Sequence, residues 1–243
     1  YFRNNNMSFL ILVRHGQSVW NLEKRFTGWV DVELTKQGES EAERAGFLIQ
    51  GKNIKIDYYY SSLQLRANNT LKIIQNILND KKNFTRAWQL NERHYGALTG
   101  FNKVEMSKQI GERKVHEFRR SWDVKPDPLN RKNSYHPINI EAYKDMPKNI
   151  IPDTESLKDT YERVSKYFED EIKQKLKDKN VLLSAHGNSI RALCKKMFKL
   201  DNNQISNLEI PTGNPLLIEL NKDSEIIKCE YLDKARSKSL LVY

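Results

Sequence analysis

Apolar residues in this chain gather into short runs, separated by longer segments in which they recur periodically. Residues 9–13 (FLILV) form one aliphatic run, and residues 181–185 (VLLSA) form a second. Such runs, bounded by polar residues, predict buried β-strands. Further strands are predicted at 56–60, 85–88, 216–220 and 226–231, the last two as a hairpin that turns at 221–223.

Between these runs, apolar residues recur at the three- and four-residue spacing that is typical of amphipathic helices. The stripe is clearest from Leu157 to Leu176, and Thr35 is expected to cap a helix that extends to about Gln50. Other helices are predicted from Ser18, at 62–78, at 102–122 and at 189–198. This alternation of strands and helices predicts a three-layer α/β fold, with a mostly parallel central sheet flanked by helices.

Residues 124–154 break the pattern, because five of the seven prolines lie here and no periodicity is sustained. The segment is too long for an ordinary connection, so we expect either a lid over a site or a partly disordered stretch. The predicted organisation is a single catalytic domain over 7–233 that includes this lid-like insertion. Residues 1–6 are expected to be an extension, and 234–243 a short basic tail.

The charge of the chain narrows the classes of partner. Lys and Arg number 41 against 31 Asp and Glu, a net charge of +10, which suits nucleic acid, anionic lipid or a phosphorylated small molecule. The basic residues are scattered and are not interleaved with stacking aromatics, which counts against nucleic acid. The run at 9–13 is far shorter than the roughly 20 residues of a membrane helix and lacks a signal-cleavage site. We therefore expect a cytoplasmic protein with a small phosphorylated substrate and no membrane partner.

Two histidines hold equivalent places, because each of the two aliphatic runs ends in a His-Gly pair, with His15 in one and His186 in the other. Carboxyl ends of parallel neighbouring strands meet at one sheet edge, so both imidazoles are expected to face one crevice. A neutral imidazole there can act as a nucleophile, and the following glycine lets backbone approach an anion. Arg14 adds a guanidinium suited to phosphate oxygens. The alternative, that each histidine only satisfies a backbone carbonyl, fits His116 and His136 better than this repeated arrangement.

The residues around these histidines carry a family resemblance. LVRHGQSVWN at 12–21 resembles the signature of the histidine phosphatase superfamily, and EKRFTGW at 23–29 resembles its cofactor-dependent phosphoglycerate mutase branch. The remaining matches are collinear: LNERHYG at 90–96, FNK at 101–103, RRS at 119–121, ESLKDT at 155–160, AHGNSIRA at 185–192 and IPTGNP at 210–215. Together they extend over nearly the whole chain, from about residue 7 to 231.

The resemblance implies interconversion of 3-phosphoglycerate and 2-phosphoglycerate, in glycolysis and gluconeogenesis, through a phosphohistidine at His15. It implies 2,3-bisphosphoglycerate as the primer and a homodimer or homotetramer. The implied catalytic residues are His15 as nucleophile, His186 as a donor to the phosphoryl oxygens, Arg14 and Arg66 as its clamp, and Glu92 as general acid and base. The implied substrate-binding residues are Asn21, Thr27, Gly28, Tyr95, Lys103, Arg119, Arg120, Gly187 and Asn188. No metal is expected, because the chain has no Walker sequence or carboxylate cluster, and arginines and imidazoles replace the metal's charge.

The chain departs from the family pattern in several places. Gln17 stands where Glu is usual and Gln89 where Arg is usual, and the residues 63–65 between Ser62 and Arg66 are replaced. The short tail favours hydrolysis of the phosphohistidine, because water must be excluded for transfer, whereas the length of 124–154 favours the mutase.

Three alternatives therefore stay open beside the mutase. The first is a phosphatase that uses the same His15, with the mutase retaining some phosphatase activity as a side reaction. The second is a catalytically inactive module that binds a phosphorylated partner. The third, nucleic-acid binding, rests on net charge alone.

Overall fold

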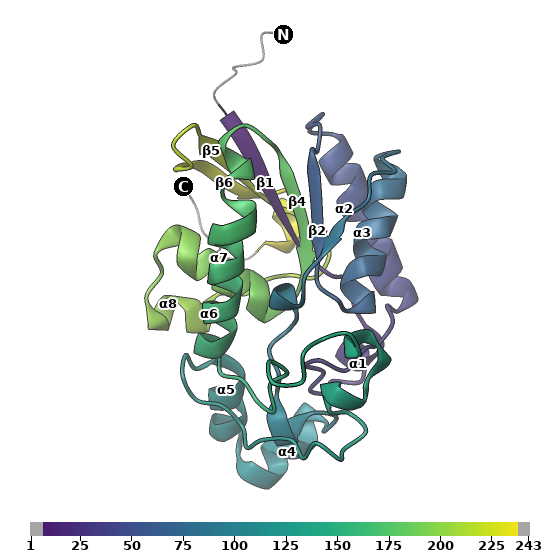
Figure 1. Ribbon diagram of the computed structural model, residues 1–243, viewed down its shortest axis with the longest axis vertical. Coiled ribbons are helices and arrows are strands. Elements are labelled where there is room, and N and C mark those ends of the chain that lie inside the picture. Colours follow the sequence, from purple (N-terminus) through teal and green to yellow (C-terminus); the bar gives the residue numbers. More distant parts are fainter. Residues whose placement is uncertain (1–6, 238–243) are drawn as a thin grey trace.

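The computed structural model describes residues 7–237 and contains a six-stranded sheet in the order β3-β2-β4-β1-β5-β6 (Figure 1). The strands are β1 (Met7–Arg14), β2 (Tyr58–Ser61), β3 (Thr85–Arg86), β4 (Val181–Ala185), β5 (Leu216–Asn221) and β6 (Ile226–Tyr231). β1, β2, β3 and β4 pair in parallel, whereas β5 and β6 pair antiparallel, β5 against β1. The predicted α/β class with a mostly parallel sheet is thus confirmed.

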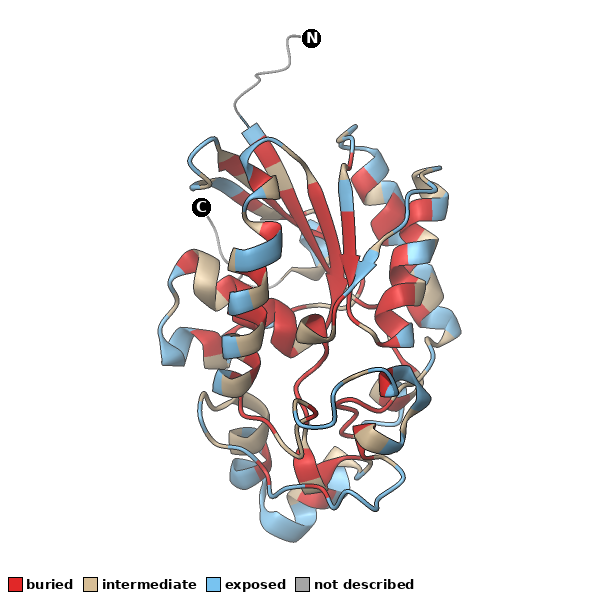
Figure 2. Ribbon diagram, in the orientation of Figure 1, coloured by how far each residue is buried: buried red, intermediate tan, exposed pale blue. Residues whose placement is uncertain are grey.

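Helices cover both faces of the sheet, which makes three layers (Figure 1). α2 (Lys36–Gln50) and α3 (Leu65–Ile77) lie on one face, and α6 (Leu157–Tyr167) and α7 (Gly187–Phe198) lie on the other. Successive side chains of a strand point to opposite faces, so β1 contributes to two cores. Leu10 and Leu12 pack with α6 and α7, while Ile11 and Val13 pack with α2 and α3. Figure 2 shows the resulting buried interior along the central strands.

Several predicted helices have different bounds in the structure. α1 is a single turn (Val19–Leu22) that Ser18 caps, and α3 begins later than position 62. The charged stretch at 102–122 is two helices, α4 (Lys103–Ile110) and α5 (Glu112–Arg120), because Gly111 between them has a φ of 89°, which ends a helix. The stripe at 157–176 changes from α6 to a π-helix (Phe168–Ile172) and a 3₁₀ turn (Lys175–Lys177). α8 (Asn202–Asn207) was not predicted.

The remaining short 3₁₀ segments belong to loops. They are Trp88–Leu90, Gly96–Leu98, Pro137–Asn139, Glu141–Tyr143 and Lys234–Arg236. Predicted strand 85–88 therefore ends two residues early and continues into the first of these segments, and the predicted hairpin turn extends to residue 225.

Residues 124–154 form turns that pack against the lower part of the molecule in Figure 1. Tyr143 is buried, and its hydroxyl donates to the carbonyl of Trp29. His136 is also buried, and its Nε2 lies 2.9 Å from the carboxylate of Asp153. The role of this segment as a lid stays a prediction. The predicted extension at 1–6 and the end of the basic tail, 238–243, lie outside the described residues.

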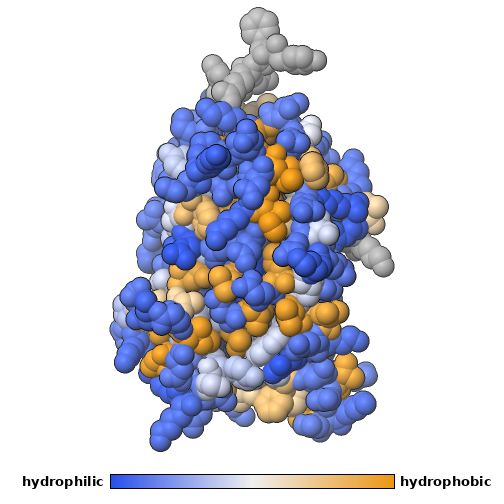
Figure 3. Space-filling model, turned by 90° about the vertical axis from the view of Figure 1, so that its right-hand side faces the viewer, coloured by the Kyte–Doolittle hydropathy of each residue, from blue (hydrophilic) through white to orange (hydrophobic). Residues whose placement is uncertain are grey.

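The carboxyl ends of β1 and β4 point toward the part of the molecule that holds α1, α4 and α5 (Figure 1). Within residues 7–237, no helix has the length and apolar character needed to cross a bilayer. The side of the molecule that carries α2 and α3 is mostly hydrophilic, with apolar side chains showing between polar ones (Figure 3). A polar recess lies at the carboxyl ends of β1 and β4, between the sheet and the helices α4 and α5.

Candidate active site

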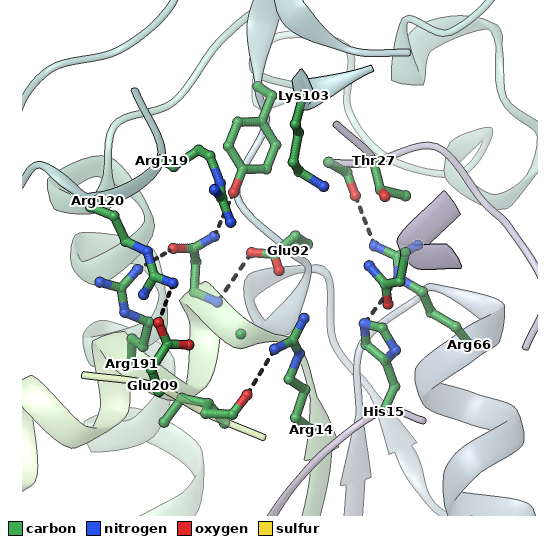
Figure 4. A pocket seen from close by; sticks show the side chains of 16 residues that line it. Arg14, His15, Thr27, Arg66, Glu92, Lys103, Arg119, Arg120, Arg191 and Glu209 are labelled. Atoms are coloured by element: carbon green, nitrogen blue, oxygen red, sulfur yellow. Dashed lines mark hydrogen bonds and ion pairs between the residues drawn. The ribbon is translucent and has the colours of Figure 1, made fainter. Parts of the chain in front are cut away.

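A single pocket at the carboxyl ends of β1 and β4 collects nearly all the predicted site residues (Figure 4). Thirteen of them line it: Arg14, His15, Asn21, Thr27, Gly28, Arg66, Glu92, Tyr95, Lys103, Arg119, Arg120, Gly187 and Asn188. His186 is the exception, because it is fully buried beside His15 and does not line the pocket. The segments that meet here are far apart in the sequence, so the fold rather than local order assembles the pocket.

His15 follows β1 directly and is held by main chain on both sides. Its N–H donates to the carbonyl of Ala185 on β4 at 3.0 Å, and its Nδ1 lies 2.7 Å from the carbonyl of Gly16. A carbonyl can only accept, so Nδ1 carries the proton and Nε2 keeps its lone pair. Nε2 accepts from Nε of Arg66 at 3.3 Å. The imidazole is therefore fixed in the tautomer that leaves Nε2 nucleophilic.

His186 occupies the matching position after β4, and its ring centroid is 5.0 Å from that of His15. This distance and the pairing of Arg14 with Ala185 confirm that the two imidazoles meet at one sheet edge. The prediction that both face one crevice is met by His15, whereas His186 is fully buried and does not line the pocket. Nε2 of His186 lies 2.8 Å from Oγ of Ser62, and its backbone N–H donates to Ser189. Burial next to Arg66 holds the pKa of His186 well below 6.5.

The same causes act on His15, whose pKa is well below 6.5 because of burial, then Arg66, then Arg14. Arg66 is itself buried on α3 and donates to the carbonyls of Val30 and Gly28 at 2.9 Å each. Arg14 donates to the carbonyl of Ile210 at 2.7 Å, and its Nε is buried without a partner among the described residues. These guanidiniums are oriented before any ligand arrives, which is the arrangement that stabilises developing phosphoryl charge without reorganisation.

Glu92 lies across the pocket from His15, in a segment between two 3₁₀ turns (Figure 4). Its Oε1 accepts from the backbone N–H groups of Arg93 at 2.7 Å and Asn188 at 3.2 Å. Its backbone carbonyl accepts from Arg163 at 3.0 Å, and Arg163 forms a buried ion pair with Glu155. Because two donors already occupy Oε1, a proton exchanged with a ligand would move at Oε2.

The first turn of α7 lines the pocket through Gly187 and Asn188. The amide of Asn188 donates to the hydroxyl of Tyr95 at 3.1 Å and accepts from Arg191 at 3.0 Å. Burial, with Arg120 and Arg93 nearby, lowers the pKa of Arg191 to about 9. Arg191 thus fixes the amide orientation from behind, one helical turn along α7.

Cations from α4 and α5 form the opposite rim of the pocket, which we call the cationic rim and define as Lys103, Arg119 and Arg120. Lys103 donates to the carbonyl of Arg25 at 2.6 Å, and burial next to Arg119 and Arg14 lowers its pKa to about 8. Arg120 pairs with the carboxylate of Glu209. Arg119 forms no hydrogen bond or ion pair within residues 7–237. The rim therefore offers free positive charge to an anion.

The sequence reasoning missed three lining residues, Arg191, Glu209 and Ile210. Arg191 lies inside the quoted match at 185–192, and its position three residues after Asn188 on one helix face was a usable signal. Glu209 and Ile210 follow α8, and their place at the pocket depends on how that unpredicted helix returns the chain. Across residues 7–237, no group of three or more His, Cys, Asp or Glu side chains is placed to hold a metal ion.

Taken chemically, the pocket combines a neutral imidazole nucleophile, fixed guanidiniums around it and a carboxylate on the far side. Such a set can accept a phosphoryl group on nitrogen and move a proton to or from an oxygen on the donor. The cationic rim suits a ligand with a second anionic group.

Comparison with known proteins agrees with this chemistry. The model of the histidine phosphatase superfamily (branch 1) matches residues 10–231. A 2,3-bisphosphoglycerate-dependent phosphoglycerate mutase of Pelagibacter ubique (strain HTCC1062) is 68% identical over 238 residues, covering 98% of this chain and 100% of the relative. The protein of that name from Borreliella burgdorferi (strain ZS7) is 47% identical over 235 residues, 96% of this chain and 95% of the relative.

Solved structures with more distant sequences share the fold. A mycobacterial glucosyl-3-phosphoglycerate phosphatase superposes with a TM-score of 0.64 at 21% identity, covering 87% of this chain and 92% of the other. Mycobacterial hydrolase 2 superposes with a TM-score of 0.68 at 18% identity, covering 98% and 93%. At this identity the likeness concerns the arrangement of strands and helices.

Proposed function

This chain belongs to the histidine phosphatase superfamily (branch 1), and from that premise we infer that it is a 2,3-bisphosphoglycerate-dependent phosphoglycerate mutase. It interconverts 3-phosphoglycerate and 2-phosphoglycerate, a step of glycolysis and gluconeogenesis. One geometric observation supports this function above the others. His15, neutral and fixed in one tautomer, faces Glu92 across a pocket lined with arginines.

The pocket fits a bis-anionic primer, because it is lined by several cations and the buried Nε of Arg14 has no partner within residues 7–237. 2,3-Bisphosphoglycerate, when bound, supplies the phosphoryl group that charges His15. Arg14 and Arg66 hold the charge on the phosphoryl oxygens, and His186, whose ring lies 5.0 Å from that of His15, adds a further donor. The cationic rim and Tyr95, with Thr27 and Gly28 from their loop, hold the groups of the ligand that do not react. Asn21, Gly187 and Asn188 contribute donors to the phosphoryl end.

Phosphoryl transfer uses two residues, His15 as nucleophile and Glu92 as acid and base. Nε2 of His15 forms a bond to phosphorus while the bond between phosphorus and the donor oxygen breaks. The proton on Oε2 of Glu92 moves to that oxygen, so a neutral hydroxyl leaves. In the return step, Glu92 takes the proton of the attacking hydroxyl, the new phosphorus–oxygen bond forms, and the bond between phosphorus and Nε2 breaks. When the free hydroxyl of 3-phosphoglycerate attacks, the product is 2,3-bisphosphoglycerate, and transfer of its other phosphoryl group to Nε2 of His15 leaves 2-phosphoglycerate, the isomer.

The decisive experiment measures isomerisation with and without 2,3-bisphosphoglycerate and follows the protein by mass spectrometry. We expect primer-dependent turnover and one acid-labile phosphate on His15. Release of inorganic phosphate without isomerisation would instead assign a phosphatase, and a small phosphatase rate beside the mutase reaction is expected. Light scattering tests the further inference of a homodimer or homotetramer, and cell fractionation tests the inference of a cytoplasmic location.

A further inference from the structure

Gln64 is one of the residues at which the chain departs from the family pattern, and it lies fully buried at the start of α3. Its Nε2 donates to the carbonyl of Gly28 at 2.9 Å, and its Oε1 accepts from the backbone N–H of Glu92 at 2.9 Å. The amide orientation is unambiguous, because the carbonyl can only accept and the N–H can only donate. One side chain therefore joins two loops that both line the pocket.

The two backbone groups that Gln64 contacts lie in loops, and the one at Glu92 depends on Gln64 for its partner. Glu92 lies outside any helix or strand, and so does Gly28, whose φ is 56°. Backbone groups in buried coil have no ladder to pair with, and an unpaired buried group costs free energy. Without Gln64, the N–H of Glu92 would lose its acceptor, while the carbonyl of Gly28 would keep Arg66 as a donor.

The link reaches the reacting groups at both ends. The carbonyl of Gly28 accepts from both Gln64 and Arg66, and Arg66 donates to Nε2 of His15. At the other end, the position of the Glu92 main chain sets where its carboxylate meets the N–H of Asn188. The chain of contacts from His15 to Glu92 is thus continuous through one amide.

We propose that Gln64 is a positioning residue that fixes the distance between Glu92 and the phosphoryl-binding groups. The proposal rests on the mutase function, because it assumes that Glu92 protonates the oxygen that leaves phosphorus. Gln64 itself does not line the pocket. A displacement of about 1 Å at such a group can cost roughly 100-fold in rate, so loss of this link should weaken acid catalysis selectively.

Two phosphoryl donors with different leaving groups can show whether acid catalysis by Glu92 is selectively weakened. An alkoxide from 2,3-bisphosphoglycerate needs a proton from Glu92 as the bond to phosphorus breaks, whereas the phenolate of p-nitrophenyl phosphate leaves without one. The experiment therefore compares the rate of His15 phosphorylation by each donor in wild type, Gln64→Met and Glu92→Gln. Met has nearly the shape of Gln and lacks its polar groups.

Gln75 provides a matched control. It is a buried glutamine on the same helix, and its side chain donates to the carbonyl of Lys82 at 2.8 Å, away from the pocket. Gln75→Met should leave both phosphorylation rates within about twofold of wild type. Gln64→Leu serves as a second apolar replacement if the Met variant folds poorly, with thermal unfolding measured for every protein.

The expected result for Gln64→Met is a loss of roughly 10- to 100-fold with 2,3-bisphosphoglycerate and less than about threefold with p-nitrophenyl phosphate. Glu92→Gln should show the same pattern more strongly. Equal losses with both donors, or wild-type rates with both, would overturn the proposal. Failure of the wild type to form phosphohistidine from 2,3-bisphosphoglycerate would overturn the proposed function instead, so the two failures are distinguishable.

Discussion

The two ends of the pocket are built differently. At the phosphoryl end, His15 and Arg66 are buried. His15 directly follows β1, and Arg66 lies on α3. The ring nitrogens of His15 and the guanidinium of Arg66 form hydrogen bonds within the protein. At the cationic rim, Arg119 and Arg120 are half-buried on α5, and Arg119 has no hydrogen bond or ion pair within the described chain.

The packing beneath the two ends differs in the same way. β1 is buried between two cores, whereas α4 and α5 each contribute one buried residue, Met106 and Val115, to a small cluster with Phe26 and Leu98. Gly111 separates the two helices. We propose that this contrast reflects two roles. The phosphoryl end would hold its geometry before binding, as phosphoryl transfer requires, and the rim would recognise charge, which tolerates adjustment.

The largest effect should follow the loss of the nucleophile. His15→Asn keeps a polar side chain of moderate size but removes Nε2, so we expect mutase and phosphatase rates to fall by more than about 10⁴-fold. Steady-state assays with primer, together with mass spectrometry, measure this. Substantial isomerisation by the variant would show that the phosphoryl end is not the reacting end.

A smaller loss should follow from Arg66→Lys. Lysine keeps the charge but cannot donate to His15, Gly28 and Val30 together, so we expect kcat to fall roughly 10²- to 10³-fold. KM should change less, because the cationic rim stays intact. A change mainly in KM would contradict the view that this end acts by preorganisation.

At the rim, Arg119→Ala should raise KM for 3-phosphoglycerate about tenfold (about 1.4 kcal/mol) and change kcat by less than about threefold. Rising salt should raise KM less in the variant than in wild type, because one screened attraction is gone. Arg113→Ala is the matched control, since Arg113 is exposed on the same helix and does not line the pocket. A loss confined to kcat would place Arg119 with the reacting groups.

The smallest change is expected from pH. An ordinary histidine with a pKa of 6.5 would be about tenfold less available as a base at pH 5.5. Burial lowers the pKa of His15 and His186, so both should remain neutral as pH falls from 8 to 5.5, and their ¹⁵N resonances should not move in that interval. Movement of either resonance near pH 6.5 would contradict the buried geometry.

The lowered pKa values of His15 and His186 also make the free energy of unfolding depend on pH. The unfolded chain binds protons on these histidines as pH falls through 6.5, and the folded chain does not. The free energy of unfolding should therefore decrease below pH 6.5 and be insensitive to these two groups above it.

Much of this arrangement followed from the sequence. The aliphatic runs at 9–13 and 181–185 predicted β1 and β4, and the His-Gly pairs behind them placed two imidazoles at one sheet edge, because strand burial and strand ends are local signals. The cap at Thr35 and the helix to Gln50 were predicted for the same reason. The family motifs pointed to Glu92 and the cationic rim, although no local pattern set them apart from surface residues.

Tertiary structure alone decided the rest. The place of Glu209 and Ile210 at the pocket depends on how distant segments pack, and such contacts leave no periodic trace in the chain. Gln64 is the clearest case: in the sequence it is a departure from a pattern, and in the fold it joins Gly28 to Glu92. A hydrogen bond between residues 28 positions apart depends on loop closure and burial, which local propensity does not encode.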